Sequence, residues 1–408
     1  MAANGWNSCS VGELMISKND KSKQVKSTEY LAAGSYPVVD QSSDFICGYH
    51  DDPAKLIDTD LPLTVFGDHT RHTKYVDFPF VAGADGTQLL KPRRGIDDRF
   101  FYYLVTLAAE RIGSFGYDRH FKHLKRHVCG YPRALSEQAK VAEILSTVDR
   151  AIEQTNALIA KQRRIRTGLV QDLLFRGIDE EGILRSEQTH RFRDSPLGRI
   201  PSDWKIKPLS EVTSKLITYG IVQPGPNILE GVPFVQTKDL GSELDVNRMD
   251  RTAPEIHAAY QRSSVRAGDV VIGIRASVGS TAIIPDELDY CNISRGVARL
   301  SPRRDCISGR FLLWMIKAEH VQKLILREVK GSTYPEITLP ALRSIVIPVP
   351  QMKEQMRISG LMDAAENAVK QTTSASQKIR SLKDGLMQDL LTGKKRVTPL
   401  LEGMEVTS

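Results

Sequence analysis

Apolar residues recur at alternating steps of four and three along Ser136–Leu174, and the same spacing recurs along Lys353–Leu391. This period predicts two amphipathic helices, each with a coiled-coil seam. Neither stretch contains proline, which would interrupt a helix. At ~1.5 Å per residue each helix would be roughly 55–60 Å long, more than a compact domain needs. The seam positions predicted to lie between the helices or against a partner are Val148, Ile152, Leu169, Leu173, Ala365, Val369, Leu386 and Leu390.

The two stretches align with each other without a gap. Glu137-Gln138 falls on Glu354-Gln355 near the start, and QDLL ends both stretches. Even the polar interruptions of the seam coincide, since Arg166 falls on Lys383. Two unrelated amphipathic helices would not share such interruptions, so the pattern favours a tandem duplication.

Each helix follows a globular segment, and the two segments begin alike, with WNSCSVGEL at Trp6 and WKIKPLSEV at Trp204. Their interiors do not align by eye, as expected if each recognises something different on a shared scaffold. In the second segment, apolar spacing predicts a helix over 308–329. We predict an α+β fold, with two mixed α/β domains separated by an antiparallel coiled coil of two long helices and an internal pseudo-two-fold repeat. The predicted boundaries are a first globule at 1–133, a first helix at 134–177, a linker at 178–200, a second globule at 201–350, a second helix at 351–393 and a C-terminal tail at 394–408.

Composition narrows the class of protein. The net charge of +7 permits a nucleic-acid partner. Five cysteines without a CxxC pair indicate a reducing compartment. The N-terminal sequence has no signal-peptide pattern, and no apolar stretch is long enough to cross a membrane. We therefore expect a soluble, cytoplasmic protein.

The sequence contains no recognisable catalytic motif. It lacks a GxxxxGK[ST] phosphate loop and an NPPY-like methyltransferase motif. His120, His123 and His127 would share one helix face, as metal ligands can, but lysines and arginines interleave with them and disfavour a cation site. We therefore predict no catalytic residue, no metal and no cofactor.

Basic side chains cluster in loops and at strand ends of both globules. Arginine can pair in two-pronged fashion with base edges, and lysine and serine commonly meet phosphates. We expect Arg275 to read a base, because Ser277 and Gly279 leave room for close approach, and Arg93 and Arg94 to meet phosphate. The candidate DNA-binding residues are Arg71, Lys74, Lys91, Arg93, Arg94, Arg262, Arg275, Ser277 and Arg295.

These features together resemble the specificity subunit of Type I restriction–modification systems. The matching features are the paired helices with their EQ start and LxQDLL end, the strand IVIPVP, and the run GDVVIGIRAS, VGSTAII and ISRGVARL of the second globule. The second globule and both helices match well, and the first globule matches more weakly.

The resemblance implies a function. Each globule would be a target recognition domain that reads one half of an asymmetric, bipartite site in double-stranded DNA. The helices would pack antiparallel, set the unread spacer and dock two methyltransferase subunits, and a motor–nuclease subunit would join that complex. The specificity subunit itself would be non-catalytic, in agreement with the absence of catalytic motifs.

Two other functions stay open from the residues alone. One is a coiled-coil scaffold whose two globules bind proteins or small ligands. The other is the specificity part of a fused nuclease–methylase, although the missing motifs argue against it. The basic loops favour DNA over the scaffold.

Overall fold

The structure is a computed structural model, which describes residues 5–113, 119–331 and 334–405. The chain divides into a first unit, made of Met1–Ala157 and Thr373–Ser408, and a second unit, Leu158–Thr372. The long helices are α4 (Leu135–Phe175) and α10 (Met352–Leu390), and each contributes residues to both units. Both helices begin one residue after their predicted starts.

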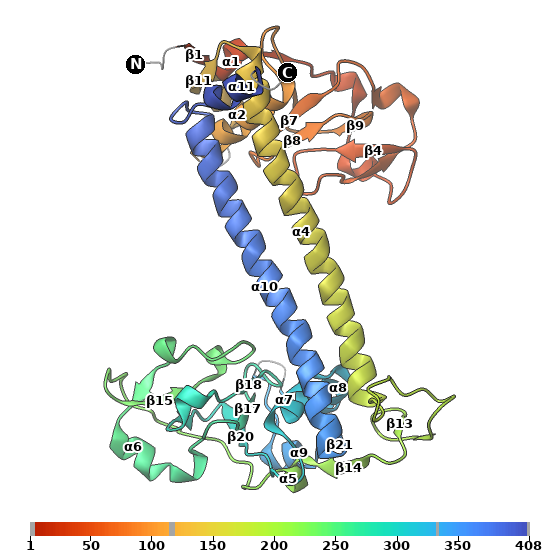
Figure 1. Cartoon of the computed structure of the whole chain (residues 1–408), viewed down its shortest axis with the longest axis vertical. Helices are drawn as coiled ribbons and strands as arrows, with labels where there is room; N and C mark the ends of the chain where they lie inside the picture. Colours follow the sequence, from red (N-terminus) through yellow and green to blue (C-terminus); the bar gives the residue numbers. More distant parts are fainter. Residues whose placement is uncertain (1–4, 114–118, 332–333, 406–408) are drawn as a thin grey trace. The chain divides into compact units, whose positions relative to one another are not determined.

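Within each unit, α4 and α10 lie side by side (Figure 1). In the first unit, Lys383 Nζ lies 2.6 Å from Asp149, and Ser376 Oγ donates a hydrogen bond of 3.2 Å to Asn156. Residue numbers therefore fall on one helix as they rise on the other. The predicted antiparallel packing is confirmed.

The matched polar interruptions of the seam form matched ion pairs. Arg166 Nη1 lies 2.8 Å from Glu366 in the second unit, and Lys383 pairs with Asp149 in the first. Glu366 and Asp149 are themselves equivalent in the alignment of the two helices. These pairs are partly exposed, so each is worth ~0.2–1 kcal/mol. The two ion pairs therefore join equivalent positions, with the roles of the two helices exchanged.

The predicted seam is mostly inside. Its buried members are Ile152, Leu173, Val369 and Leu390. Its half-buried members are Val148, Leu169, Ala365 and Leu386. Leu173 packs into the core of the second unit and Leu390 into the core of the first, so the helix ends are part of the globules they adjoin.

The described residues of the first globule form two sheets and a strand pair. An antiparallel sheet has the order β2-β10-β7-β8, and helix α2 packs against three of its strands. A second, mixed sheet has the order β3-β9-β4-β5, with β6 also paired to β9. The strands are β1 (Trp6–Ser10), β2 (Met15–Ser17), β3 (Gln24–Val25), β4 (Tyr36–Val39), β5 (Gly48–His50), β6 (Leu56–Ile57), β7 (Leu63–Gly67), β8 (Thr73–Val76), β9 (Phe80–Gly83), β10 (Thr87–Pro92) and β11 (Val128–Pro132). The helices are α1 (Val11–Leu14), α2 (Asp98–Arg111), α3 (Phe121–Arg126) and, after α10, α11 (Thr398–Glu405).

The second globule has smaller sheets. One has the order β16-β15-β19 and another β18-β17-β20, and helix α7 packs against β17 and β18. The strands are β12 (Phe192–Arg193), β13 (Ile200–Pro201), β14 (Lys205–Pro208), β15 (Val232–Val235), β16 (Arg251–Thr252), β17 (Val270–Gly273), β18 (Thr281–Ile283), β19 (Asn292–Ile293), β20 (Val297–Leu300) and β21 (Val346–Val349). The helices are α5 (Leu209–Val212), α6 (Pro254–Ala259), α7 (Gly309–Lys317), α8 (Glu319–Arg327) and α9 (Leu339–Ser344).

A common frame surrounds these different interiors. In the first unit β1 pairs antiparallel with β11, and in the second β14 pairs antiparallel with β21. A buried tryptophan stands at the start of each frame, Trp6 in one and Trp204 in the other. With the paired helices, this repeated frame confirms the predicted fold class.

Two segments differ from their sequence-based description. The helix predicted over 308–329 is two helices, because the backbone is extended at Ala318 and Gln322 Nε2 donates to the Ile316 carbonyl at the end of α7. The predicted linker 178–200 is folded onto the second unit, where Ile178, Leu197 and Ile200 are buried in the core.

Candidate nucleic-acid interface

Two exposed arginines, Arg93 and Arg94, lie in the loop between β10 and α2. The loop is fastened at both ends. The backbone N–H of Arg93 donates to the Leu14 carbonyl (2.8 Å), and the Asp97 side chain caps α2 by accepting the backbone N–H of Phe100 (2.8 Å). A fixed loop therefore presents two guanidinium groups to solvent.

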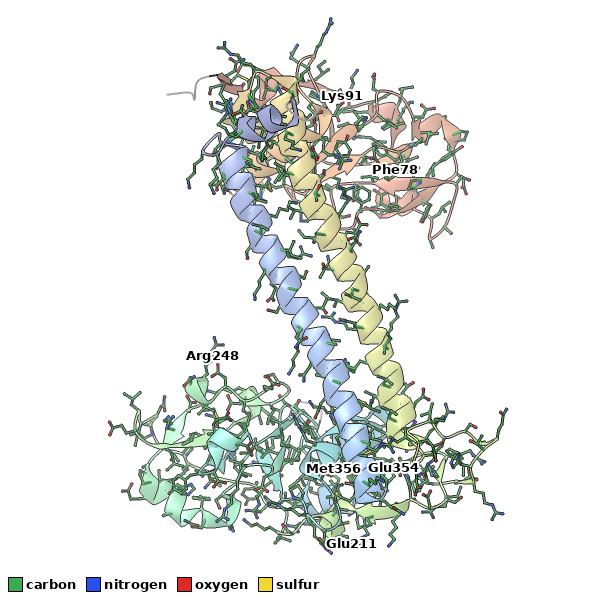
Figure 2. All side chains as sticks on the ribbon, in the orientation of Figure 1. Phe78, Lys91, Glu211, Arg248, Glu354 and Met356 are labelled. Carbon is green, nitrogen blue, oxygen red and sulfur yellow. The ribbon has the colours of Figure 1, made fainter. Side chains whose placement is uncertain are left out.

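Lys91 and Arg71 are less available. Lys91 Nζ, in β10 (Figure 2), lies 2.8 Å from Asp98 and donates to the Pro62 carbonyl (3.0 Å). Arg71 is half-buried, and its Nη1 donates to the Ile112 carbonyl (2.8 Å). Both side chains already hold neighbouring segments of the first globule together.

Lys74 does not reach the surface. Its side chain is only 5% exposed, and Nζ donates to the backbone carbonyls of Asp40 (2.8 Å) and Asp44. Burial lowers the pKa of Lys74, and the negative charge of Asp40 opposes this shift. Because its ammonium is buried and bonded to backbone carbonyls, Lys74 is not available to DNA, contrary to the prediction from the sequence.

The carboxylate of Glu336 orients the Arg275 side chain. Its Nη2 lies 2.7 Å from Glu336 Oε1, and both side chains are partly exposed. The next residue, Ala276, has a left-handed backbone (φ 58°), a conformation that costs an alanine roughly 1 kcal/mol or more. The exposed Ser277 follows. The turn thus leaves part of a pre-oriented guanidinium and the exposed Ser277 at the surface, while the Arg275 Nε is buried without a hydrogen-bond partner among the described residues.

Arg262 and Arg295 are exposed on separate turns. The backbone N–H of Arg295 donates to the Ile221 carbonyl (2.8 Å), which fixes the turn after β19. Arg262 lies at the rim of a basic cavity together with Arg299, which sequence reasoning did not single out.

The long helices carry a second feature that sequence reasoning missed. Ile165 is 50% exposed and Leu382 is 56% exposed, and they are equivalent in the helix alignment. One turn further on, Gly168 and Gly385 are also equivalent, and a Cβ at either would meet open space. The signal was available in the alignment, as a large apolar residue repeated outside the seam.

The described part of the chain holds no group of three or more His, Cys, Asp or Glu side chains that could bind a metal. Of the histidines considered as ligands, His120 is buried, with its Nδ1 2.9 Å from the Asp68 carbonyl. Within the same residues, no helix combines the length and apolar character that crossing a membrane requires.

Comparison with known sequences finds similarity to one family. Residues 201–380 match the profile of the Type I restriction modification DNA specificity domain. The EcoBI specificity subunit of Escherichia coli is 26% identical over 64% of this chain. The MjaVIII specificity subunit of Methanocaldococcus jannaschii is 24% identical over 75% of this chain and 72% of its own length. The chain is therefore similar to the specificity subunits of Type I restriction–modification systems.

The match covers only 57% of the length of the EcoBI subunit. Both of these relatives are named as specificity subunits. The fold agrees with this family. The S subunit from M. genitalium has a TM-score of 0.62 at 17% identity, over 95% of this chain and 96% of that one. A chain from a study of type I R-M complex assembly and conformational transition has a TM-score of 0.56 at 19% identity, over 97% and 100%.

Proposed function

We propose that this chain is the DNA-recognition subunit of a Type I restriction–modification complex and acts in the cytoplasm. Residues 1–133 and 201–350 are its target recognition domains, and each reads one half of an asymmetric bipartite site in double-stranded DNA. The helices α4 and α10 set the unread spacer between the halves. The chain carries out no catalytic step and needs no cofactor.

The main support for this proposal is that both units share the same frame while the sheets inside the two frames differ. Each unit repeats the strand pair, the buried tryptophan and the helix contacts, while the sheets between them differ in strand number and order. A repeated frame would hold two readers in equivalent positions on a duplex, which has two-fold symmetry of its own. Different interiors would then read different sequences.

The candidate DNA-binding residues differ in their exposure and in the groups that hold them. Arg93 and Arg94 are exposed on a loop and can meet phosphates, whereas the Lys91 and Arg71 side chains bind groups within the first globule. Arg275 is aimed by Glu336 and is the best candidate for reading a base, since a guanidinium held in one plane suits the two acceptors of guanine. Ser277, Arg262 and Arg295 would add phosphate contacts.

The exposed apolar positions on the helices suit two copies of one partner. Ile165 with Gly168, and Leu382 with Gly385, each offer a large apolar side chain beside a backbone that another helix can approach closely. Because the positions are equivalent, they would bind two methyltransferase subunits in the same way. Motor–nuclease subunits would then join through that complex.

DNA binding separates this function from a scaffold with protein- or ligand-binding globules. The measurement is the affinity of the full chain for random duplex over a salt series, because neutralised phosphates make the affinity fall steeply with salt. Alanine at Arg275 should cost ~1–3 kcal/mol on the specific site and relax one base position. Alanine at Arg93 should weaken all duplexes equally and lower the salt slope by about one. A chain that binds no duplex at low salt would support the scaffold instead.

A further inference from the structure

A cavity of about 400 Å³ opens on the second globule, apart from the Arg275 turn. It is bordered by the segment after α5, by a short 3-10 turn and by strand β20. Three of its lining residues are cationic and none is acidic. The lining residues are Lys215, Leu216, Thr218, Gln261, Arg262 and Arg299.

Arg299 is the unusual member of this set. It is only 4% exposed, and its guanidinium donates to the backbone carbonyls of Ser264 (2.9 Å) and Leu216 (3.3 Å). Its Nε is buried and has no hydrogen-bond partner among the described residues. Burial lowers the pKa of Arg299 and the charge of Asp269 opposes this shift, yet a guanidinium stays protonated at neutral pH. A positive charge is therefore held mainly by neutral groups.

Such a charge is costly to bury unless an opposite charge meets it. The two carbonyl contacts give Arg299 a structural task, since they tie together the segments around Leu216 and Ser264. They do not explain why Lys215 and Arg262, both exposed, lie at the rim of the same cavity. Three like charges around one hollow repel each other, and a bound anion would relieve that repulsion.

We propose that this cavity binds a phosphate group. Arg299 forms its inner wall, and Lys215 and Arg262 close over the oxygens from the rim. Planar guanidinium groups and a mobile ammonium suit an anion with several oxygens. The phosphate is either part of a DNA backbone or belongs to a free phosphate compound, and only the DNA source rests on the proposed function.

The first arm of the test uses inorganic phosphate and no DNA. Thermal unfolding of the full chain is followed in phosphate and in sodium chloride of equal ionic strength. Wild type and the control Arg266→Gln, which removes an exposed arginine four residues from Arg262 and outside the cavity lining, should gain Tm in phosphate relative to chloride. Arg262→Gln and Lys215→Gln should gain less Tm in phosphate than the control does, since only the general stabilisation by phosphate remains. Their Tm in chloride should be no lower than that of wild type, because one of the repelling charges is gone.

The second arm measures binding of random duplex over a salt series with the same variants. A DNA source predicts that Arg262→Gln lowers the salt slope by about one, while Arg266→Gln leaves it unchanged. A free phosphate compound predicts that the duplex slope is unchanged in both and that only the phosphate arm responds. If Arg262→Gln and Arg266→Gln behave alike in both arms, the cavity is not a phosphate site. The measurement in inorganic phosphate remains a test of the cavity even if the chain binds no DNA.

Discussion

Gln138 and Gln355 make the same hydrogen bonds, each in its own unit. The side-chain oxygen of Gln138 accepts the backbone N–H of Asp97, the residue that caps α2, and that of Gln355 accepts the N–H of Ser308, which caps α7. Each amide nitrogen donates to a carbonyl just before its own long helix, at 2.8 and 2.9 Å. Both glutamines are fully buried. The duplicated glutamine therefore ties each long helix to the helix of the adjoining globule.

Alanine at Gln138 or Gln355 should destabilise the unit in which it lies. The buried N–H and carbonyl groups left without a partner should cost ~1–3 kcal/mol. Denaturant unfolding measures the total, and hydrogen exchange shows which unit loosens. Gln154→Ala on the exposed face of α4 is the control and should stay within about 0.5 kcal/mol of wild type. Equal loosening of both units by either variant would contradict this role.

In the proposed complex, aspartate at Ile165 or at Leu382 should each remove one methyltransferase subunit. A charge at the centre of an apolar contact leaves a desolvated group without a partner. Native mass spectrometry would report one bound methyltransferase in each single variant and none in the double variant. Both side chains are half exposed in the chain alone, so its own stability should change little. A single variant that lost both subunits, or neither, would rule out matched docking positions.

The effects of mutating Arg166 and Glu366 on stability should be coupled, because the two residues form an ion pair between the helices. Arg166→Glu places two acids together, and adding Glu366→Arg should restore most of the lost stability. Because the pair is partly exposed, we expect a coupling energy of ~0.2–1 kcal/mol that shrinks in high salt. A double-mutant cycle by thermal unfolding measures it. Strict additivity of the two changes would mean that the two side chains do not interact.

Glu354 should make the chain less stable as the pH rises. It lies in the first turn of α10 (Figure 2) and meets Arg185 at 3.1 Å and the Trp204 indole N–H at 3.1 Å. Burial raises the pKa of Glu354, and this outweighs the pull of these partners. The folded state then holds a proton that the unfolded state has released.

The stability of wild type relative to Glu354→Gln should therefore be highest below the unfolded value of about pH 4.3 and fall as the pH rises through the folded pKa of Glu354. Urea unfolding between pH 4 and 8 measures this difference. Glu153→Gln, at an exposed position on α4, controls for the loss of one charge. If the stability of wild type relative to Glu354→Gln increased with pH, the prediction would be contradicted.

The helices and the duplication could be predicted from the sequence because both are local or repeated signals. A seven-residue period is visible in any one stretch, and matched interruptions such as Arg166 and Lys383 need only an alignment. The break at Ala318 could not be predicted in this way, since it depends on a glutamine that bonds back to the preceding helix.

The candidate interface was harder to predict because exposure is a tertiary property. Lys74 and Arg93 look alike as basic loop residues, yet one is buried against carbonyl groups and the other is exposed. Arg299 sits within an apolar strand, and only the fold places its guanidinium at the wall of a cavity.

The most direct test of two independent readers is an exchange of one globule. Residues 1–133 are replaced by the same segment of a relative with a known site, the chain is assembled with the methyltransferase subunits of the proposed complex, and the methylated positions in genomic DNA are sequenced. Two readers on one frame predict that one half of the bipartite sequence changes while the other half and the spacer stay the same. A folded exchange variant whose two half-sites change together would contradict the account.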